Sequence, residues 1–324
     1  MIVIGREDVR ARLTWDVAIP LVREAMIALS RGETRQTLRS IIDLDAGRAF
    51  GVMPGAMGPG RVFGAKLISV YPENFAKGRQ SHQGFVALFD PESGEVAAIV
   101  HAGEITAIRT AAASAAATDA LARADAGVLA ILGYGEQARE HAHALARVRP
   151  LAEIRVWGRS AERAAAFAAE AGAALDLPTH AAPTARDAVS GADIVCTTTA
   201  AAEPILLGEW LSEGTHVNLV GSSRAGPVEC DEALVARSRF FADHAAGVRA
   251  QGAEFIKALE RGAVGPDHLL GEIGEVFDGR LPGRVSASDV TVYKSLGSIV
   301  QDLASAWTLY EQALGGGFGT RVDF

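Results

Sequence analysis

The segment that most constrains what this chain can fold into is 126–143, which reads AGVLAILGYGEQAREHAH. An apolar run with the length of a buried strand is followed by the pattern G-x-G-x-x-A at Gly133, Gly135 and Ala138, and then by a stretch rich in helix formers. The first glycine permits a tight turn, the second lets the backbone approach a pyrophosphate, and the alanine lets the helix pack close to the strand. The segment therefore predicts a dinucleotide site at a helix N-terminus, although an ordinary strand-to-helix turn has the same pattern.

Length and charge narrow the class of protein. The chain has 324 residues, enough for two domains, and its 49% hydrophobic and 22% charged residues are typical of a soluble globular protein. A net charge of −8 argues against nucleic acid or an anionic membrane as a partner. No apolar run approaches the ~18 residues of a membrane helix, and we expect no secretory signal. Cys196 and Cys230 are too few for a disulfide framework, and no Cys/His cluster has zinc spacing, so we expect a cytoplasmic protein without a metal.

The first hundred residues indicate short strands joined by turns. Thr14 is placed to cap a helix that ends near Ser30, and the glycine-rich stretch 49–60 reads as a flexible, turn-rich segment. The expected strands are 37–44, 62–71, 84–89 and 96–100. These segments predict a mainly antiparallel sheet, followed by an alanine-rich helix over 103–122.

After the glycine turn the pattern changes to alternating strands and helices, which predicts a parallel sheet with helices on both faces. The expected strands are 153–157, 193–198, 215–220, 239–242 and 285–295, with helices over 161–171 and, more briefly, 186–190. A last helix, 296–314, is expected to return to the N-terminal domain and make that domain discontinuous.

The strand that follows the glycine-turn helix ends in Gly158-Arg159-Ser160 and carries no acidic residue there. An acid at this position favours NAD, whereas an arginine accommodates the extra phosphate of NADP. Arg159 can fork onto a phosphate and Ser160 can donate a hydrogen bond to it. We therefore expect NADP(H) to be preferred, with NAD(H) possible; the alternative is a solvated arginine beside a helix-capping serine.

Three cations in the N-terminal half, Arg39, Lys66 and Arg109, are candidates for binding a small carboxylate substrate. Lys66 lies inside an apolar strand, where a charge is unfavourable unless it is paired or used. Arg109 lies in a helix that is otherwise mostly alanine, which leaves space for a ligand. Taken singly, each of the three is more often structural than catalytic.

Polar residues also end two later strands, at the carboxyl edge where ligands bind in such folds. Thr198 lies in a run of three threonines after one strand, and the next strand continues into the segment VNLVGSSRAG, 217–226. His82, just before a strand, is a weaker candidate.

Several of these segments together resemble the ornithine cyclodeaminase and mu-crystallin family over nearly the whole chain. The resemblance rests on GAKLISVYPEN at 64–74, GEITAIRTAAASAAAT at 103–118, LGYGEQAREH at 132–141, VWGRS at 156–160 and VNLVGS at 217–222. It implies an α/β fold: a Rossmann-type dinucleotide-binding domain over 116–287, and an α+β substrate and dimerisation domain built from both chain ends, 1–115 and 288–324.

The family's functional positions can be carried over to matching residues. The resemblance implies that Arg39, Lys66 and Arg109 bind the substrate carboxylate, with Lys66 and Arg109 also catalytic candidates. The cofactor contacts that it implies are Thr110, Gly133, Gly135, Glu136, Gln137, Arg159, Ser160, Thr198, Val220 and Ser222.

One position departs from the cyclodeaminase pattern. Those enzymes carry an aspartate in a G-x-D-x-P-G-like block, and Ser223 stands at that place here. A serine hydroxyl is a poor general base without a partner, whereas reduction of a preformed cyclic imine requires mainly positioning and a hydride from the cofactor. We therefore expect Ser223 to orient the imine or a water.

The function that these features favour is NAD(P)H-dependent reduction of small cyclic imine carboxylates, of the type that converts Δ1-pyrroline-2-carboxylate to L-proline. Ornithine cyclodeamination, or amino-acid oxidoreduction of the alanine dehydrogenase type, is the first alternative. A crystallin-like protein that binds NADPH without turnover is the second. The expected partners are the small-molecule substrate and, from the resemblance, a second copy in a homodimer.

Overall fold

The computed structural model describes residues 1–323, apart from the side chains of residues 75 and 76. The chain divides into two compact units. The first contains Met1–Thr110 and the residues from Ser298 onward, and the second is Ala111–Gly297. Helix α3 (Ala102–Leu121) runs through the boundary between them. Within residues 1–323, no helix is long and apolar enough to cross a membrane.

The first unit is built on a mixed, mainly antiparallel sheet, as the sequence predicts. Its strands follow the order β16-β1-β7-β6-β5-β4-β2. Strand β2 pairs with the end of β4, at residues 55 and 56, and β3 pairs with residues 48–52 of β4. Neighbours pair antiparallel except β1 with β7. The strands are β1 (Ile2–Ile4), β2 (Arg35–Gln36), β3 (Ser40–Asp45), β4 (Arg48–Ala56), β5 (Phe63–Val70), β6 (His82–Phe89), β7 (Val96–His101) and β16 (Thr320–Arg321).

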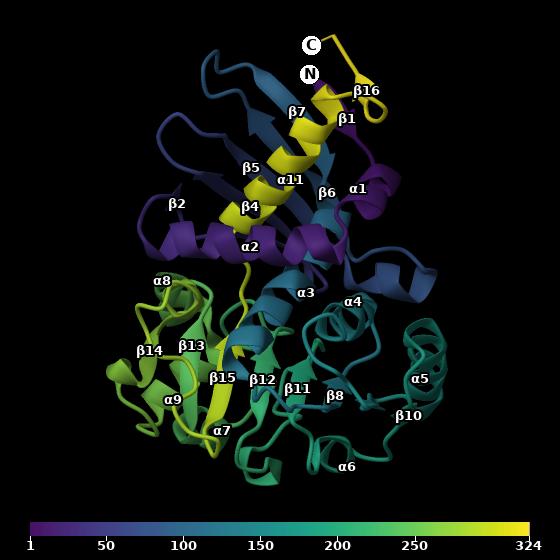
Figure 1. Cartoon of the computed structure of the whole chain (residues 1–324), viewed down its shortest axis with the longest axis vertical. Helices are drawn as coiled ribbons and strands as arrows, with labels where there is room; N and C mark the ends of the chain where they lie inside the picture. Colours follow the sequence, from purple (N-terminus) through teal and green to yellow (C-terminus); the bar gives the residue numbers. More distant parts are fainter. Residues whose placement is uncertain (324) are drawn as a thin grey trace. The chain divides into compact units, whose positions relative to one another are not determined.

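Helices α1 (Arg6–Arg12), α2 (Trp15–Ser30) and α11 (Ile299–Leu314), with a 3-10 turn at Pro72–Lys77, complete this unit. Helix α11 packs across β4, β5 and β6, and α2 crosses over α11 on the side away from the sheet (Figure 1). Thr14 is the N-cap residue of α2, at the position the sequence predicts, but its side chain makes no capping hydrogen bond. This arrangement carries residues from the C-terminal helix onto the N-terminal sheet.

The prediction of a flexible stretch at 49–60 is wrong for its first part, because Arg48–Ala56 forms strand β4 between β3 and β5. One glycine of this segment, Gly55, is required for helix packing. A Cβ on Gly55 would lie 2.6 Å from the side chain of Ile299 in α11, so a larger residue would push the helix off the sheet.

The second unit has the predicted parallel sheet, in the order β10-β9-β8-β11-β12-β15-β13-β14. The strands are β8 (Val128–Leu132), β9 (Glu153–Trp157), β10 (Thr179–Ala181), β11 (Ile194–Thr197), β12 (His216–Leu219), β13 (Ser238–Ala242), β14 (Leu269–Glu272) and β15 (Val290–Lys294). The helices are α4 (Glu136–Leu145), α5 (Ala161–Leu175), α6 (Ala185–Val189), α7 (Glu232–Arg237), α8 (Ala245–Gln251), α9 (Ala253–Glu260) and α10 (Ile273–Phe277).

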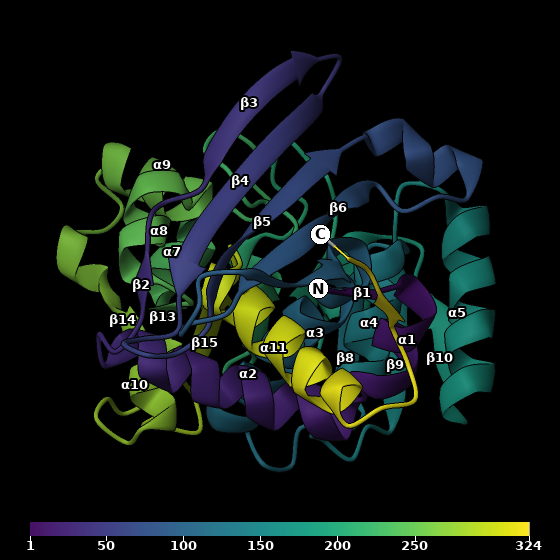
Figure 2. The ribbon, with the colours of Figure 1, turned by 90° about the horizontal axis from the view of Figure 1, so that it is seen from above.

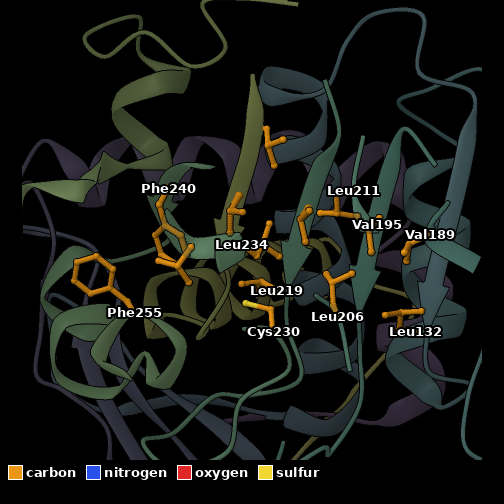
Figure 3. Close-up of a cluster of buried hydrophobic side chains, with 14 of the residues drawn as sticks. Leu132, Val189, Val195, Leu206, Leu211, Leu219, Cys230, Leu234, Phe240 and Phe255 are labelled. Atoms are coloured by element: carbon orange, nitrogen blue, oxygen red, sulfur yellow. The ribbon is translucent and has the colours of Figure 1, made fainter. Parts of the chain in front are cut away.

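One hydrophobic core lies on a face of this parallel sheet (Figure 3). Strands β8, β11, β12 and β13 contribute Leu132, Val195, Leu219 and Phe240, which are completely buried. Helices α6, α7 and α9 cover them, and Phe255 of α9 packs against Phe240 with 5.6 Å between ring centroids. The apolar core ends before the carboxyl ends of these strands, where polar residues such as Thr198 and Ser222 follow.

The predicted second domain boundary, between 287 and 288, differs from the structural one at Gly297. The physical reason is strand pairing, because β15 (Val290–Lys294) lies between β12 and β13 in the parallel sheet. Strand β15 therefore belongs to the second unit, and the return to the first unit begins at Ser298.

Candidate functional site

A buried cluster in the first unit joins two of the three predicted cations. Lys66 on β5 is 2% exposed, and its Nζ donates to both carboxylate oxygens of Asp302 at 3.0 and 3.1 Å. Arg109 on α3 is 4% exposed, and its Nε donates to Asp302 Oδ1 at 3.1 Å. Lys66 also donates to Thr106 Oγ1, and Arg109 to Gln301 Oε1. A carboxylate on α11 thus holds an ammonium and a guanidinium side by side.

Burial and neighbouring charges set the protonation of this cluster. Burial lowers the pKa of Lys66 to about 8; the charge of Asp302 opposes this shift, while Arg109 and Arg39 add to it. Burial alone would raise the pKa of Asp302, but the charges of Arg109 and Lys66 outweigh it and leave that pKa below its ordinary value. At neutral pH the cluster therefore contains an ammonium that loses its proton as the pH rises through about 8.

Two further residues lie within electrostatic reach of the cluster. Arg39 is half-buried and directly precedes β3, and its charge contributes to the low pKa of Lys66. His82, at the start of β6, is also half-buried, and burial together with the charges of Lys66 and Arg109 lowers its pKa to about 4. His82 is thus a neutral hydrogen-bonding group at physiological pH, with Nδ1 2.9 Å from Ser81 Oγ.

Asp302 was absent from the sequence prediction, although it organises the cluster. It lies 236 positions from Lys66, so only the fold brings the two together. A signal was present in the sequence, because Gln301 and Asp302 interrupt the apolar segment SIVQDLASAW. A buried acid in such a helix needs a cationic partner.

In the second unit, the glycine turn has the geometry that a dinucleotide site requires. Gly133 has φ of +132°, and a Cβ there would lie 2.5 Å from Thr198 Oγ1, so a side chain is excluded. Gly135 is the N-cap residue of α4 and has no side chain to occupy the first N–H groups of the helix. The side-chain oxygen of Gln137 is buried without a hydrogen-bond partner in residues 1–323. Glu136 opens the helix. The glycine turn and the open N–H groups of this helix N-terminus fit a bound pyrophosphate.

The predicted phosphate-selecting pair lies at the end of β9. Arg159 is exposed, which is compatible with ligand binding and with a solvated charge. Ser160 is the N-cap residue of α5, because its Oγ accepts a hydrogen bond from Arg163 N at 3.3 Å. Ser160 therefore caps α5, and its hydroxyl proton is still available to donate. Thr110 lies in the first unit, where its hydroxyl donates to the carbonyl of Thr106.

The other predicted cofactor residues follow β11 and β12. Thr198 is half-buried and bonds to Leu132 O through its N–H. Val220 is buried, and the buried hydroxyl of Ser222 donates to Pro227 O inside its own loop. Ser223 is half-exposed and makes no side-chain hydrogen bond within the part of the chain described. The structure thus leaves Ser223, rather than Ser222, with a hydroxyl free to act on a ligand.

A buried acidic group behind these loops was also missed. Glu229 and Glu254 are 0% and 2% exposed, and the completely buried Lys294 lies 2.8 Å from Glu254 Oε2. Burial raises the pKa of Glu229, although hydrogen bonds from Thr197 and Thr199 oppose the shift. No local pattern signals this group, because Glu229 follows an irregular loop with no periodicity.

The second unit, with a parallel sheet, a side-chain-free turn after β8 and an open helix N-terminus, defines a Rossmann-type dinucleotide-binding protein. The first unit adds a buried acid–base cluster of Lys66, Arg109 and Asp302. Comparison with known proteins then identifies the family. A profile of the ornithine cyclodeaminase/mu-crystallin family matches residues 1–317, and the chain belongs to this family. The resemblance predicted from sequence motifs is confirmed.

Characterised relatives cover the chain almost completely. The ketimine reductase mu-crystallin of Mus musculus is 33% identical over 314 residues, which are 95% of this chain and 96% of the relative. A Δ1-pyrroline-2-carboxylate reductase of Bacillus cereus is 31% identical over 327 residues, covering 100% of both chains.

Solved structures confirm the predicted fold class. The Δ1-pyrroline-2-carboxylate reductase of Thermococcus litoralis, in complex with NADH and L-proline, is 32% identical and superposes with a TM-score of 0.96, covering 99% of this chain and 100% of that one. An archaeal alanine dehydrogenase dimer with bound NAD is 27% identical, with a TM-score of 0.92, and covers 100% of this chain and 99% of that one.

Proposed function

We propose that this chain is an NAD(P)H-dependent reductase of small cyclic imine carboxylates, of the type that converts Δ1-pyrroline-2-carboxylate to L-proline. The observation that carries the proposal is the buried Lys66 ammonium, held by Asp302 beside the Arg109 guanidinium. Such a group offers a proton and a carboxylate-binding cation together, as imine reduction requires. The ketimine and pyrroline-2-carboxylate reductases among the relatives support the same reaction.

The residues of the first unit have separate roles in this proposal. When bound, the reduced dinucleotide supplies the hydride that turns C=N into CH–NH. Lys66 gives a proton to the imine nitrogen, which makes the adjacent carbon electrophilic, and is reprotonated from water. Arg109 and Arg39 bind the substrate carboxylate. Asp302 keeps Lys66 protonated and fixes the orientation of both cations.

The second unit is assigned to the cofactor. Gly133, Gly135, Glu136 and Gln137 are assigned to the pyrophosphate, and Thr198 and Val220 to the nicotinamide end. Solved relatives bind NADH and NAD, so a nicotinamide dinucleotide is well supported. A preference for NADP(H) is our further proposal, which rests on the exposed Arg159 at the end of β9 and on the absence of an acid there.

Ser223 separates this proposal from cyclodeamination, because it offers a hydroxyl where a cyclodeaminase carries an acid. We assign Ser223 to orienting the imine or a water. Its hydroxyl is half-exposed and makes no hydrogen bond to residues 1–323, so it is available for this role. Amino-acid oxidoreduction of the alanine dehydrogenase type is the second candidate, since the archaeal alanine dehydrogenase superposes over the whole chain.

A homodimer in the cytoplasm is the proposed state of the enzyme. The archaeal alanine dehydrogenase, which is a dimer, supports a dimer here. Strand β3 also leaves Ile41, Ile42 and Leu44 exposed within the single chain. An apolar edge strand of this kind favours contact with another protein surface.

The deciding experiment is a steady-state assay of purified protein with NADPH or NADH and Δ1-pyrroline-2-carboxylate, followed by nicotinamide absorbance and by L-proline formation. We expect stoichiometric oxidation of the cofactor and formation of proline. Release of ammonia from ornithine without imine reduction would restore the cyclodeaminase, and turnover of pyruvate with ammonia alone would favour the second candidate. Cofactor binding without turnover on this panel would indicate a binding protein.

A further inference from the structure

Glu229 is a completely buried carboxylate that gathers donors from two separate loops of the second unit. Its Oε1 accepts hydrogen bonds from the backbone N–H and the hydroxyl of Thr199, both at 2.7 Å. Its Oε2 accepts one from Thr197 Oγ1 at 2.6 Å and one from Gly221 N at 2.7 Å. Two carboxylate oxygens take about four such bonds, so the acceptor capacity of this side chain is filled.

A second layer holds Glu229 and the same loop from behind. The backbone N–H of Glu229 donates to Glu254 Oε1 at 3.2 Å, and Glu254 Oε2 lies 2.8 Å from Lys294 Nζ. Lys294 donates in turn to the carbonyl oxygen of Ser222 at 2.6 Å. The contacts form a closed, buried ring that fixes the backbone after β11 to the backbone after β12.

The strand order of the sheet indicates that this ring lies at the nicotinamide end of the cofactor site. Strand β9 lies on one side of β8, and β11 and β12 lie on the other. A dinucleotide in such a sheet has its adenosine ribose at the end of β9 and its pyrophosphate at the β8 turn, so its nicotinamide end falls on the loops after β11 and β12. Ser295, which follows β15 at the same edge, has a buried hydroxyl without a hydrogen-bond partner in residues 1–323.

We propose that Glu229 is a positioning residue that shapes the nicotinamide end of the dinucleotide site by fixing residues 197–199 to residues 220–222. The inference rests on the proposed dinucleotide-dependent function and assigns a role to a residue outside the glycine turn. Glu229→Gln keeps the volume of the side chain but offers one acceptor oxygen in place of two. At least one of its four donors then faces an amide NH2 group, and a buried donor without a partner is costly enough to move its loop.

The test compares complete cofactors with fragments that lack the nicotinamide. Dissociation constants are measured by calorimetry for NADH against ADP-ribose, and for NADPH against 2′-phospho-ADP-ribose, with nicotinamide fluorescence as a second readout. We expect Glu229→Gln to weaken binding of the complete cofactor at least tenfold and to leave the fragment within twofold. Equal weakening of both ligands would show a merely structural role, and no change in either would show no role; both results would overturn the inference.

Two variants keep the test informative. Asp193→Asn is the matched control, because Asp193 accepts backbone N–H groups of Gly127 and Val128 at the opposite, amino-terminal edge of the same sheet. It should leave the ratio of cofactor to fragment affinity unchanged. Thr197→Val removes one donor and keeps the carboxylate, so it should produce a smaller shift of the same kind if Glu229→Gln fails to fold.

The two proposals can fail separately. Wild-type protein that binds the reduced cofactor but does not reduce Δ1-pyrroline-2-carboxylate would reject the proposed reaction and leave the affinity ratios as a valid test of Glu229. Wild-type turnover with unchanged ratios in Glu229→Gln would reject only the role of Glu229.

Discussion

At the scale of single residues, the Lys66–Asp302 pair determines how the proposed reaction depends on pH. Lys66 donates a proton only while it is an ammonium, and its pKa is about 8. We therefore expect kcat/KM for imine reduction to fall as pH rises through about 8. Asp302 raises the pKa of Lys66, so Asp302→Asn should move this fall to lower pH. It should also destabilise the fold by about 3–5 kcal/mol, because it leaves buried charges uncompensated.

Direct titration can check this assignment without turnover. The chain contains four lysines, Lys66, Lys77, Lys257 and Lys294, so a protein labelled with 13C at lysine Cε gives few signals. The signal lost in Lys66→Met should titrate near pH 8 in the wild type and lower in Asp302→Asn. Glu104→Gln is the control, since Glu104 is a buried carboxylate of the same unit that pairs with Arg6 and Arg10. A Lys66 midpoint that stays the same in Asp302→Asn would contradict the role of Asp302.

Arg159 is the residue on which the choice between NADPH and NADH should depend. A charge-assisted hydrogen bond to phosphate contributes about 1.5–3 kcal/mol, so Arg159→Gln should raise the KM for NADPH at least roughly tenfold. The KM for NADH, which lacks the 2′-phosphate, should stay within about twofold and serves as the internal control. Equal effects on both cofactors in steady-state kinetics would reject the NADP preference.

At the scale of secondary-structure elements, the turn between β8 and α4 should not tolerate a side chain. Gly133→Ala forces a Cβ onto a residue with φ of +132° and to within 2.5 Å of Thr198 Oγ1. We expect a loss of about 1–3 kcal/mol in the free energy of unfolding and a large loss of dinucleotide affinity. Gly127→Ala is the matched control, because a Cβ there meets its nearest neighbour at an ordinary 3.7 Å. Chemical denaturation and calorimetry measure the two effects, and tight binding by Gly133→Ala would contradict the pyrophosphate assignment.

Elements with strong local patterns were predictable from the sequence, and those stabilised by tertiary contacts were not. The β8–turn–α4 segment and helix α3 lie where the apolar run, the glycines and the alanines predicted them. Strand β4 was missed because its glycines read as turn signals, whereas in the fold Gly55 makes room for α11. The short helices α8 and α9 were also missed, since each has too few turns to give a clear period.

In the candidate site, too, residues with a local sequence signal were predictable and those that depend on tertiary contacts were not. Lys66 and Arg109 were predictable because a charge in an apolar or alanine-rich segment is unusual. Their shared partner Asp302 depends on α11 packing on the N-terminal sheet, and Glu229 depends on two strand-end loops that meet only in the folded sheet. Contacts across so many residues leave no local pattern, so sequence reasoning identified the cations but not the carboxylates that organise the site.

At the scale of the whole molecule, the proposed homodimer predicts that the second copy covers strand β3. The six residues Ser40–Asp45 are all exposed, and β3 extends with β4 along the edge of the first unit's sheet (Figure 2). Ile42 is 57% exposed and Ile41 39%, on opposite faces of the strand, so both faces present apolar surface. A monomer would leave this edge strand uncovered, which natural sheets usually avoid.

Ile42→Glu should therefore shift the protein from dimer to monomer in light scattering coupled to size-exclusion chromatography. A charge at the centre of an apolar contact costs several kcal/mol of association free energy when it is buried without a partner. Val285→Glu is the control, because Val285 is 62% exposed in the second unit and should leave the dimer intact. If Ile42→Glu remains dimeric at micromolar concentration, the copies meet through another surface; if the wild type is itself monomeric, the proposed homodimer is wrong.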